Sequence, residues 1–127
     1  MKHELLMKIL DSGVVAVVRR VDNDKVMNVI AALVEGGITG IEMTMDSDDV
    51  LNIIAKAKQE YGDRAVIGAG TVLDGETAKL AIQAGAEFIF APTLNQQTIA
   101  VSNRYGKIAI PGVFTPTEIL QAHEWGA

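Results

Sequence analysis

Residues 36–44 read Gly-Gly-Ile-Thr-Gly-Ile-Glu-Met-Thr, a largely apolar strand pattern that contains one carboxylate, Glu42. Strands of a parallel sheet normally read as nearly unbroken apolar runs, because both of their faces are covered. A carboxylate in such a strand is costly unless it is paired, hydrogen-bonded or kept for chemistry. Glu42 is therefore the first candidate for a functional residue.

Strand patterns of this kind recur along the chain, and a helical pattern follows each of them. The sequence predicts strands at residues 14–19, 38–44, 65–70, 86–91 and 108–110. It predicts a leading helix at residues 3–12 and further helices at about 75–84 and 95–104. Three more helices are predicted from their capping residues, and they begin at Asp22 or Asn23, at Ser47 or Asp48, and at Thr115 or Thr117. Alternating strands and helices form parallel sheets with right-handed crossovers. Residues 1–127 are thus expected to form one α/β domain, either an open doubly wound sheet or part of a (β/α)₈ barrel.

Polar residues gather where the predicted strands end, which favours the barrel. The strand ends carry, in chain order, Arg19 and Arg20, Glu42 and Thr44, Gly70 and Thr71, Pro92 and Thr93, and Pro111 and Gly112. Active sites of barrels lie at the C-terminal ends of the strands. Alternation along the second strand places Glu42 and Thr44 on one face and Ile41 and Met43 on the other. The expected fold is a (β/α)₈ TIM barrel, of which this chain supplies a leading helix and about five βα units.

Composition excludes several classes of function. The net charge of -5 and the lack of a basic cluster argue against nucleic-acid binding. The chain contains no cysteine, so disulfides, thiolate chemistry and cysteine-based zinc sites are excluded. No apolar run approaches the ~20 residues that span a membrane, and the N-terminus lacks the pattern of a signal peptide. We expect a cytoplasmic protein with no membrane partner.

Several candidate residues have a structural interpretation as well as a functional one. Arg19 could bind an anionic substrate group bidentately, or it could only neutralise Glu42 across neighbouring strands. The Gly68–Thr71 segment is a weak phosphate-loop motif, and close packing is the commoner role for glycines at a strand end. The acidic residues of segment 46–49 lie at a helix N-terminus, where the dipole favours them, so a metal site is not expected. His3 and His123 are expected on helix surfaces.

Five segments together resemble one enzyme family. They are Val-Ala-Val-Val-Arg (15–19), Gly-Gly-Ile-x-x-Ile-Glu-Met-Thr (36–44), Ile-Gly-Ala-Gly-Thr-Val-Leu (67–73), Ala-Gly-Ala-Glu-Phe-Ile-Phe-Ala-Pro (84–92) and Ile-Pro-Gly-Val-Phe-Thr-Pro-Thr-Glu (110–118). In this order and spacing they resemble the 2-keto-3-deoxy-6-phosphogluconate aldolase family, which includes the 4-hydroxy-2-oxoglutarate aldolases. The resemblance runs along the whole chain.

The resemblance implies a class I aldolase on a homotrimeric barrel, with a small keto acid as substrate and neither metal nor other cofactor. In that family a lysine forms a Schiff base with the keto carbon, and a glutamate at the position of Glu42 moves protons while the carbon–carbon bond breaks. Arg19 matches a position that holds the substrate carboxylate in some members. Other members use an arginine where this chain has Asp46, and this departure leaves the substrate preference open. Thr44, Thr71 and Pro92 are expected to line the substrate pocket.

The family's Schiff-base lysine is not found within this chain. The resemblance places it on a sixth strand, and the lysines present are predicted on helices or, for Lys107, at the opposite end of a strand. We therefore expect the 127-residue chain to be inactive alone. Two alternatives stay open at this point. One is another phosphate-handling barrel, such as an epimerase or isomerase, and the other is a non-catalytic fragment or interaction module.

Overall fold

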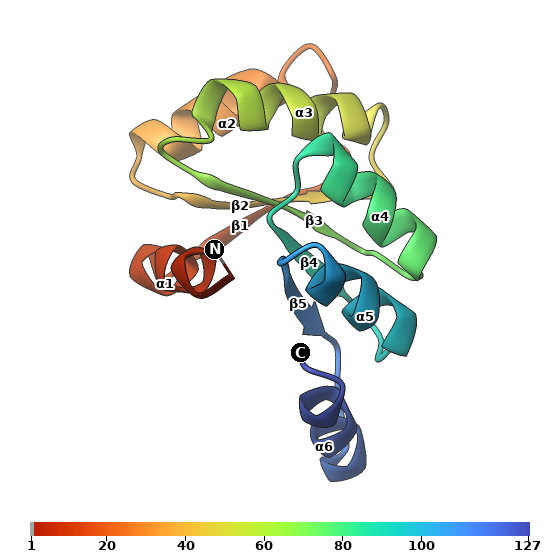
Figure 1. Ribbon diagram of the computed structural model, residues 1–127. Coiled ribbons are helices and arrows are strands. Elements are labelled where there is room, and N and C mark those ends of the chain that lie inside the picture. The colour runs from red at the N-terminus through yellow and green to blue at the C-terminus, as the bar shows by residue number, and fades with distance from the viewer. Residues whose placement is uncertain (1) are drawn as a thin grey trace.

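Helices and strands alternate along the whole described chain, residues 2–127 of a computed structural model (Figure 1). The strands are β1 (Val15–Val18), β2 (Gly40–Thr44), β3 (Val66–Gly70), β4 (Phe88–Ala91) and β5 (Ile108–Pro111). The helices are α1 (Lys2–Ser12), α2 (Val26–Glu35), α3 (Val50–Tyr61), α4 (Gly75–Ala84), α5 (Gln96–Arg104) and α6 (Pro116–Glu124). Each predicted element is present, with ends that differ by a few residues.

The order of the strands decides between the two predicted architectures. All neighbouring pairs are parallel, and the order across the sheet is β1-β2-β3-β4-β5, the same as along the chain. A doubly wound sheet reverses its direction of growth at a switch point, whereas a barrel adds each strand beside the previous one. The sheet is therefore an arc of a barrel, as the polar strand ends predicted.

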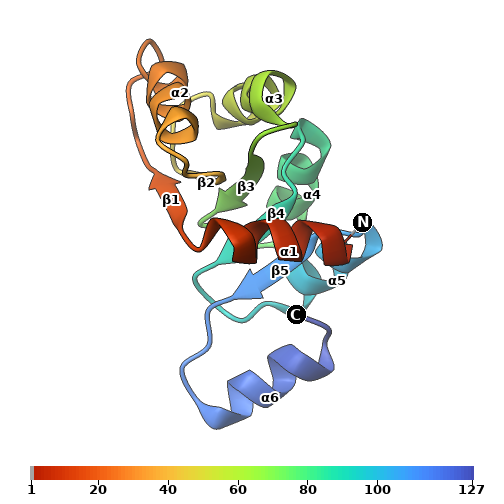
Figure 2. The ribbon, with the colours of Figure 1, turned by 90° about the vertical axis from the view of Figure 1, so that its left-hand side faces the viewer.

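The two faces of the sheet have different partners. The outer face carries Ile41, Met43, Ile67 and Ile89, which pack with α2, α3 and α4 in the main core. On the inner face, Val66, Phe88 and Ile108 form a second cluster, which Leu5 and Ile9 of α1 cover. Helix α1 thus lies on the side away from α2–α5, against β2, β3 and β5 (Figures 1 and 2). Helix α6 extends away from the sheet beyond β5 (Figure 1).

Two predicted helix caps are wrong. Helix α2 begins after Lys25, which has no side-chain cap, while the Asp22 carboxylate pairs with the Lys25 ammonium at 2.8 Å. Helix α3 begins after Asp49, which adopts a left-handed φ of 53°. Ser47 or Asp48 was expected to cap this helix, and Ser47 instead accepts a hydrogen bond from the backbone N–H of Arg20 at 2.9 Å. In both cases a side chain that could cap the helix makes its polar contact elsewhere.

The last helix follows its sequence signal. Thr115 caps α6 by accepting a hydrogen bond from the N–H of Glu118, and the Glu118 carboxylate accepts one from the N–H of Thr115. This reciprocal arrangement is a capping box. Hydrogen bonds from the backbone N–H of Phe114 and from Thr115 also lower the pKa of Glu118.

Candidate active site

The candidate site lies where the strands end, at the edge that we call the C-terminal rim. The arrowheads in Figure 2 mark this edge. It carries the predicted site residues Arg19, just after β1, Glu42 and Thr44 in β2, Thr71, just after β3, and Pro92, just after β4. Their positions at the rim were predicted from the strand ends, whereas the substrate contacts of Arg19, Thr71 and Pro92 were implied by the family resemblance.

Glu42 lies on the inner face of the sheet and is 6% exposed. Its strand neighbours in register are Val17 of β1 and Gly68 of β3. Among residues 2–127, no hydrogen bond or ion pair reaches its carboxylate. Burial raises the pKa of Glu42, and the positive charge of Arg19 opposes part of this rise. A carboxylic acid in these surroundings gives up its proton less readily than one in water, which suits a group that exchanges protons near neutral pH.

Two glycines of β3 leave room for the Glu42 carboxylate and for the ring of Phe88. A Cβ at Gly70 would overlap the carboxylate of Glu42, and a Cβ at Gly68 would overlap the ring of Phe88. The close-packing interpretation of these glycines is therefore confirmed. The role of Gly70 as the floor beneath Glu42 was not predicted, because it depends on the register that pairs β2 with β3.

Arg19 is held by two contacts across the rim. Its Nη1 lies 3.0 Å from Asp46 Oδ2, and its Nη2 donates to Thr71 Oγ1 at 3.1 Å. Half of the side chain remains exposed, at 49%. The direct ion pair with Glu42 that the sequence left open does not form, and Asp46 takes that place. A guanidinium has five N–H donors, so these two contacts leave donors for a ligand.

Asp46 joins the two arginines that follow β1. Its Oδ2 also accepts from Nε of Arg20 at 3.0 Å and pairs with Nη2 of that residue at 2.9 Å. The Thr44 hydroxyl, then Arg19 and Arg20, lower the pKa of Asp46, so its carboxylate is ionised at neutral pH. Sequence reasoning had explained Asp46 by the helix dipole alone. The contact with both arginines was missed, because it depends on how the turn after β2 folds back toward β1.

Thr44, Thr71 and Pro92 occupy different environments. Thr44 is fully buried and its hydroxyl lies 3.0 Å from Ser47 Oγ, so it braces the turn after β2. Thr71 has a left-handed φ of 57° and directs its hydroxyl to Arg19. Pro92 is exposed, and its carbonyl packs so closely on Gly112 that a Cβ there would overlap it. Thr71 is thus the one of these three that directly contacts another candidate site residue.

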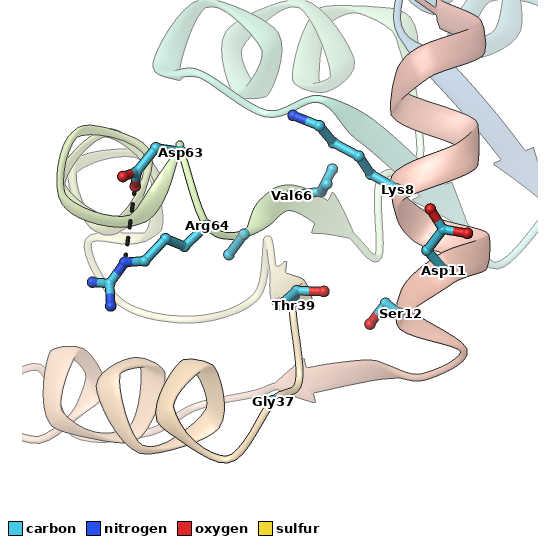
Figure 3. A pocket seen from close by; sticks show the side chains of 9 residues that line it. Lys8, Asp11, Ser12, Gly37, Thr39, Asp63, Arg64 and Val66 are labelled. Atoms are coloured by element: carbon cyan, nitrogen blue, oxygen red, sulfur yellow. Dashed lines mark ion pairs between the residues drawn. The ribbon is translucent and has the colours of Figure 1, made fainter.

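The seven lysines lie away from the interior of the rim. Five are on α1, α3 and α4, and Lys107 precedes β5 at the N-terminal end of the sheet. Lys25 was predicted within a helix, but it lies in the loop after β1, where it pairs with Asp22 and is 65% exposed. Lys8 lines a cavity of about 280 Å³ at the N-terminal end of the strands, between α1 and the start of β3 (Figure 3). Residues at that end of a barrel usually contribute to the stability of the fold.

Other expectations concern features away from the rim. His3 and His123 are exposed on α1 and α6, as predicted. Among residues 2–127, no group of three or more His, Asp or Glu side chains has the arrangement of a metal site. Within the same range, no helix is both long enough and apolar enough to cross a membrane.

Comparison with known proteins identifies the family. The family model described as KDPG and KHG aldolase matches residues 6–127. The chain belongs to this aldolase family. The 2-dehydro-3-deoxy-phosphogluconate aldolase of Treponema pallidum is 42% identical over 72 residues, which are 57% of this chain and 34% of that protein. The 2-dehydro-3-deoxy-6-phosphogalactonate aldolase of Escherichia coli is 40% identical over 67 residues, which are 53% of this chain and 33% of that protein.

Solved structures of the family share the fold. The structure described as native KDPGal superposes with a TM-score of 0.85 at 31% identity, covering 89% of this chain and 55% of that one. The chain therefore spans about half the length of this solved relative, and the matched segments cover about a third of the two curated aldolases. The arc seen here corresponds to part of a full aldolase barrel.

Proposed function

We propose that this chain carries the acid/base and carboxylate-binding half of a class I aldolase site. The substrate is a 2-keto acid of the 2-keto-3-deoxy-6-phosphogluconate or 4-hydroxy-2-oxoglutarate type, which is cleaved to pyruvate and an aldehyde. The observation that carries the proposal is Glu42, a buried carboxylate with a raised pKa and no ion-pair partner among residues 2–127, on the inner face at the C-terminal rim. Membership of an aldolase family supports the reaction class.

In this proposal the Schiff base is formed by a lysine outside residues 2–127, with the keto carbon of the substrate. The resulting iminium accepts the electron pair of the breaking carbon–carbon bond. Glu42, as carboxylate, removes the proton of the substrate's C4 hydroxyl, so that the C3–C4 bond breaks, the aldehyde leaves and an enamine remains. Glu42, now protonated, returns its proton to C3, and hydrolysis of the imine releases pyruvate. Burial favours this exchange because it brings the two protonation states of Glu42 closer in free energy.

Arg19 supplies the positive charge that the substrate carboxylate needs. Its guanidinium stands at the rim, half exposed and oriented by Asp46 and Thr71. Guanidinium–carboxylate pairs form short, charge-assisted hydrogen bonds that fix orientation as well as affinity. Thr44 supports this site from below by bracing the turn that carries Asp46, and Pro92 forms part of the wall.

Homo-oligomerisation is part of the same proposal. The segment after β5 exposes Phe114 at 99%, and Ile119 and Leu120 of α6 at 57% each. Large exposed apolar side chains such as these are typical of surfaces that pack against another chain.

The test uses a chimera in which residues 1–127 are followed by the part of the Treponema pallidum relative that would complete the barrel. With Glu42→Gln, the retro-aldol kcat should fall by about a hundredfold or more, because a positioned acid/base group contributes roughly 10²–10⁴. Circular dichroism checks that the fold is kept. Turnover within a few-fold of the parent would show that Glu42 is structural and would favour a non-catalytic role for this residue.

A further inference from the structure

A continuous set of polar contacts runs around the rim from β2 to β3 by way of both arginines. The Thr44 hydroxyl contacts Ser47 Oγ at 3.0 Å, and Ser47 Oγ accepts from the backbone N–H of Arg20 at 2.9 Å. Two nitrogens of Arg20 meet Asp46 Oδ2 at 3.0 and 2.9 Å, and the same oxygen meets Arg19 at 3.0 Å. Arg19 then reaches the Thr71 hydroxyl, so Asp46 stands between the two arginines.

The charges of this set do not cancel. Arg19 and Arg20 contribute two positive charges and Asp46 one negative charge, so these three side chains together keep one positive charge. A carboxylate that neutralised Arg19 alone would compete with an anionic ligand. Because Arg20 shares the same oxygen, Asp46 can orient Arg19 while the site keeps its attraction for anions.

We propose that Asp46 is a positioning residue, which holds the guanidinium of Arg19 in place to receive the carboxylate of a keto acid. This rests on the proposed function, in which Arg19 binds that carboxylate. A free arginine side chain has many rotamers, and ordering it during binding weakens affinity. Asp46 on one side and Thr71 on the other remove that freedom before the ligand arrives.

Two variants separate position from charge. Asp46→Asn keeps an oxygen acceptor at the same place and removes the charge, whereas Asp46→Ala removes both. Asp48→Ala is the matched control, because Asp48 lines the same rim hollow as Asp46 and Arg20 and is exposed. It removes one negative charge without touching Arg19. Thr71→Val removes the other contact of Arg19 and gives a second test from the β3 side.

The first readout needs no ligand. In the ¹⁵N-labelled 127-residue chain, the Arg19 Nε–H signal should be distinct from that of a free arginine. The chemical shift of this signal should move toward that of a free arginine in Asp46→Ala and should stay unchanged in Asp46→Asn and Asp48→Ala.

The second readout is the Kd for pyruvate, from NMR titration with methyl pyruvate as the uncharged control. Asp46→Ala should bind pyruvate roughly threefold to tenfold more weakly than Asp48→Ala, as expected for one long side chain that must be ordered on binding. The Kd of Asp46→Asn should stay within about twofold of that of Asp48→Ala, and the Kd of Thr71→Val should lie between those of Asp48→Ala and Asp46→Ala.

Failure of this inference differs from failure of the proposed function. If Arg19→Leu binds pyruvate as well as the parent does, Arg19 is not the carboxylate receptor, and the proposed function fails in this part together with the inference. If Arg19→Leu loses binding but Asp46→Ala matches Asp48→Ala in affinity and leaves the Arg19 signal unchanged, only the positioning role is overturned. Tighter pyruvate binding in both Asp46 variants than in Asp48→Ala would mean that Asp46 acts only by repelling anions.

Discussion

Gly70 provides a direct way to test how the Glu42 carboxylate is seated. A Cβ at Gly70 would overlap Oε1, Cδ and Cγ of Glu42. Overpacking of this kind typically costs about 1–3 kcal/mol. Replacing glycine by alanine where φ is compatible stabilises the folded state by about 0.4–1 kcal/mol, because alanine restricts the unfolded chain. Gly70 has no left-handed φ, so this gain applies to it. Gly70→Ala should therefore lower the free energy of unfolding by roughly 1–2 kcal/mol at pH 7.

The same substitution should be harmless once the carboxylate is gone. In a Glu42→Ala background the overlap is absent, so Gly70→Ala should be neutral or stabilising by up to about 1 kcal/mol. The assay is a double-mutant cycle from urea unfolding of the 127-residue chain, followed by far-UV circular dichroism. Gly68→Ala is the control, because its Cβ would meet the Phe88 ring and it should keep most of its cost in both backgrounds. A Glu42–Gly70 coupling below about 0.5 kcal/mol would refute the described seating of the carboxylate, since independent sites add within that range.

Three further predictions concern charge and chemistry. Because burial raises the pKa of Glu42, its contribution to the free energy of unfolding is complete below the pKa of the unfolded state and is lost as pH rises through the higher native pKa. The stability of Glu42→Gln relative to the parent should therefore grow from below pH 4.5 toward neutrality. A difference in stability that does not depend on pH would contradict the raised pKa. Glu87→Gln should cost about 1–3 kcal/mol in urea unfolding, because it removes the negative charge that pairs with the Lys58 ammonium, 2.9 Å from Glu87 Oε1. An unchanged midpoint would show that this pair adds nothing. Incubation of the 127-residue chain with pyruvate and borohydride should give no specific adduct by mass spectrometry, since no lysine lies inside the rim, and a stoichiometric adduct at one lysine would overturn that assignment.

The fold was predictable because its signal is local and repeated. Each strand and helix of the described chain overlaps a predicted range, since apolar periodicity marks which face of an element is covered. The sequence also predicted that Glu42 lies near the end of its strand, on the face opposite Ile41 and Met43. The choice of barrel over doubly wound sheet needed the polar strand ends, and the strand order then confirmed it.

The contacts of the site were less predictable, because they join segments far apart in the chain. Arg19 could have met Glu42 or a ligand, and the turn after β2 brought Asp46 to it instead. Ser47 was expected to cap α3, but the backbone N–H of Arg20 occupies its hydroxyl. The sequence shows glycines at alternate positions of β3, Gly68 and Gly70. That Gly70 leaves room for the Glu42 carboxylate became clear only with the register between β2 and β3.

The proposed function requires that burial at the C-terminal rim prepares the carboxyl group of Glu42 for proton transfer. The most direct measurement is a ¹³C NMR titration of the Glu42 carboxyl carbon in the 127-residue chain, assigned by comparison with Glu42→Gln. We predict a pKa above the ordinary value of 4.5, and a further rise in Arg19→Leu, because Arg19 opposes the effect of burial. A pKa at or below 4.5 would show a solvated or paired carboxylate and would contradict the account.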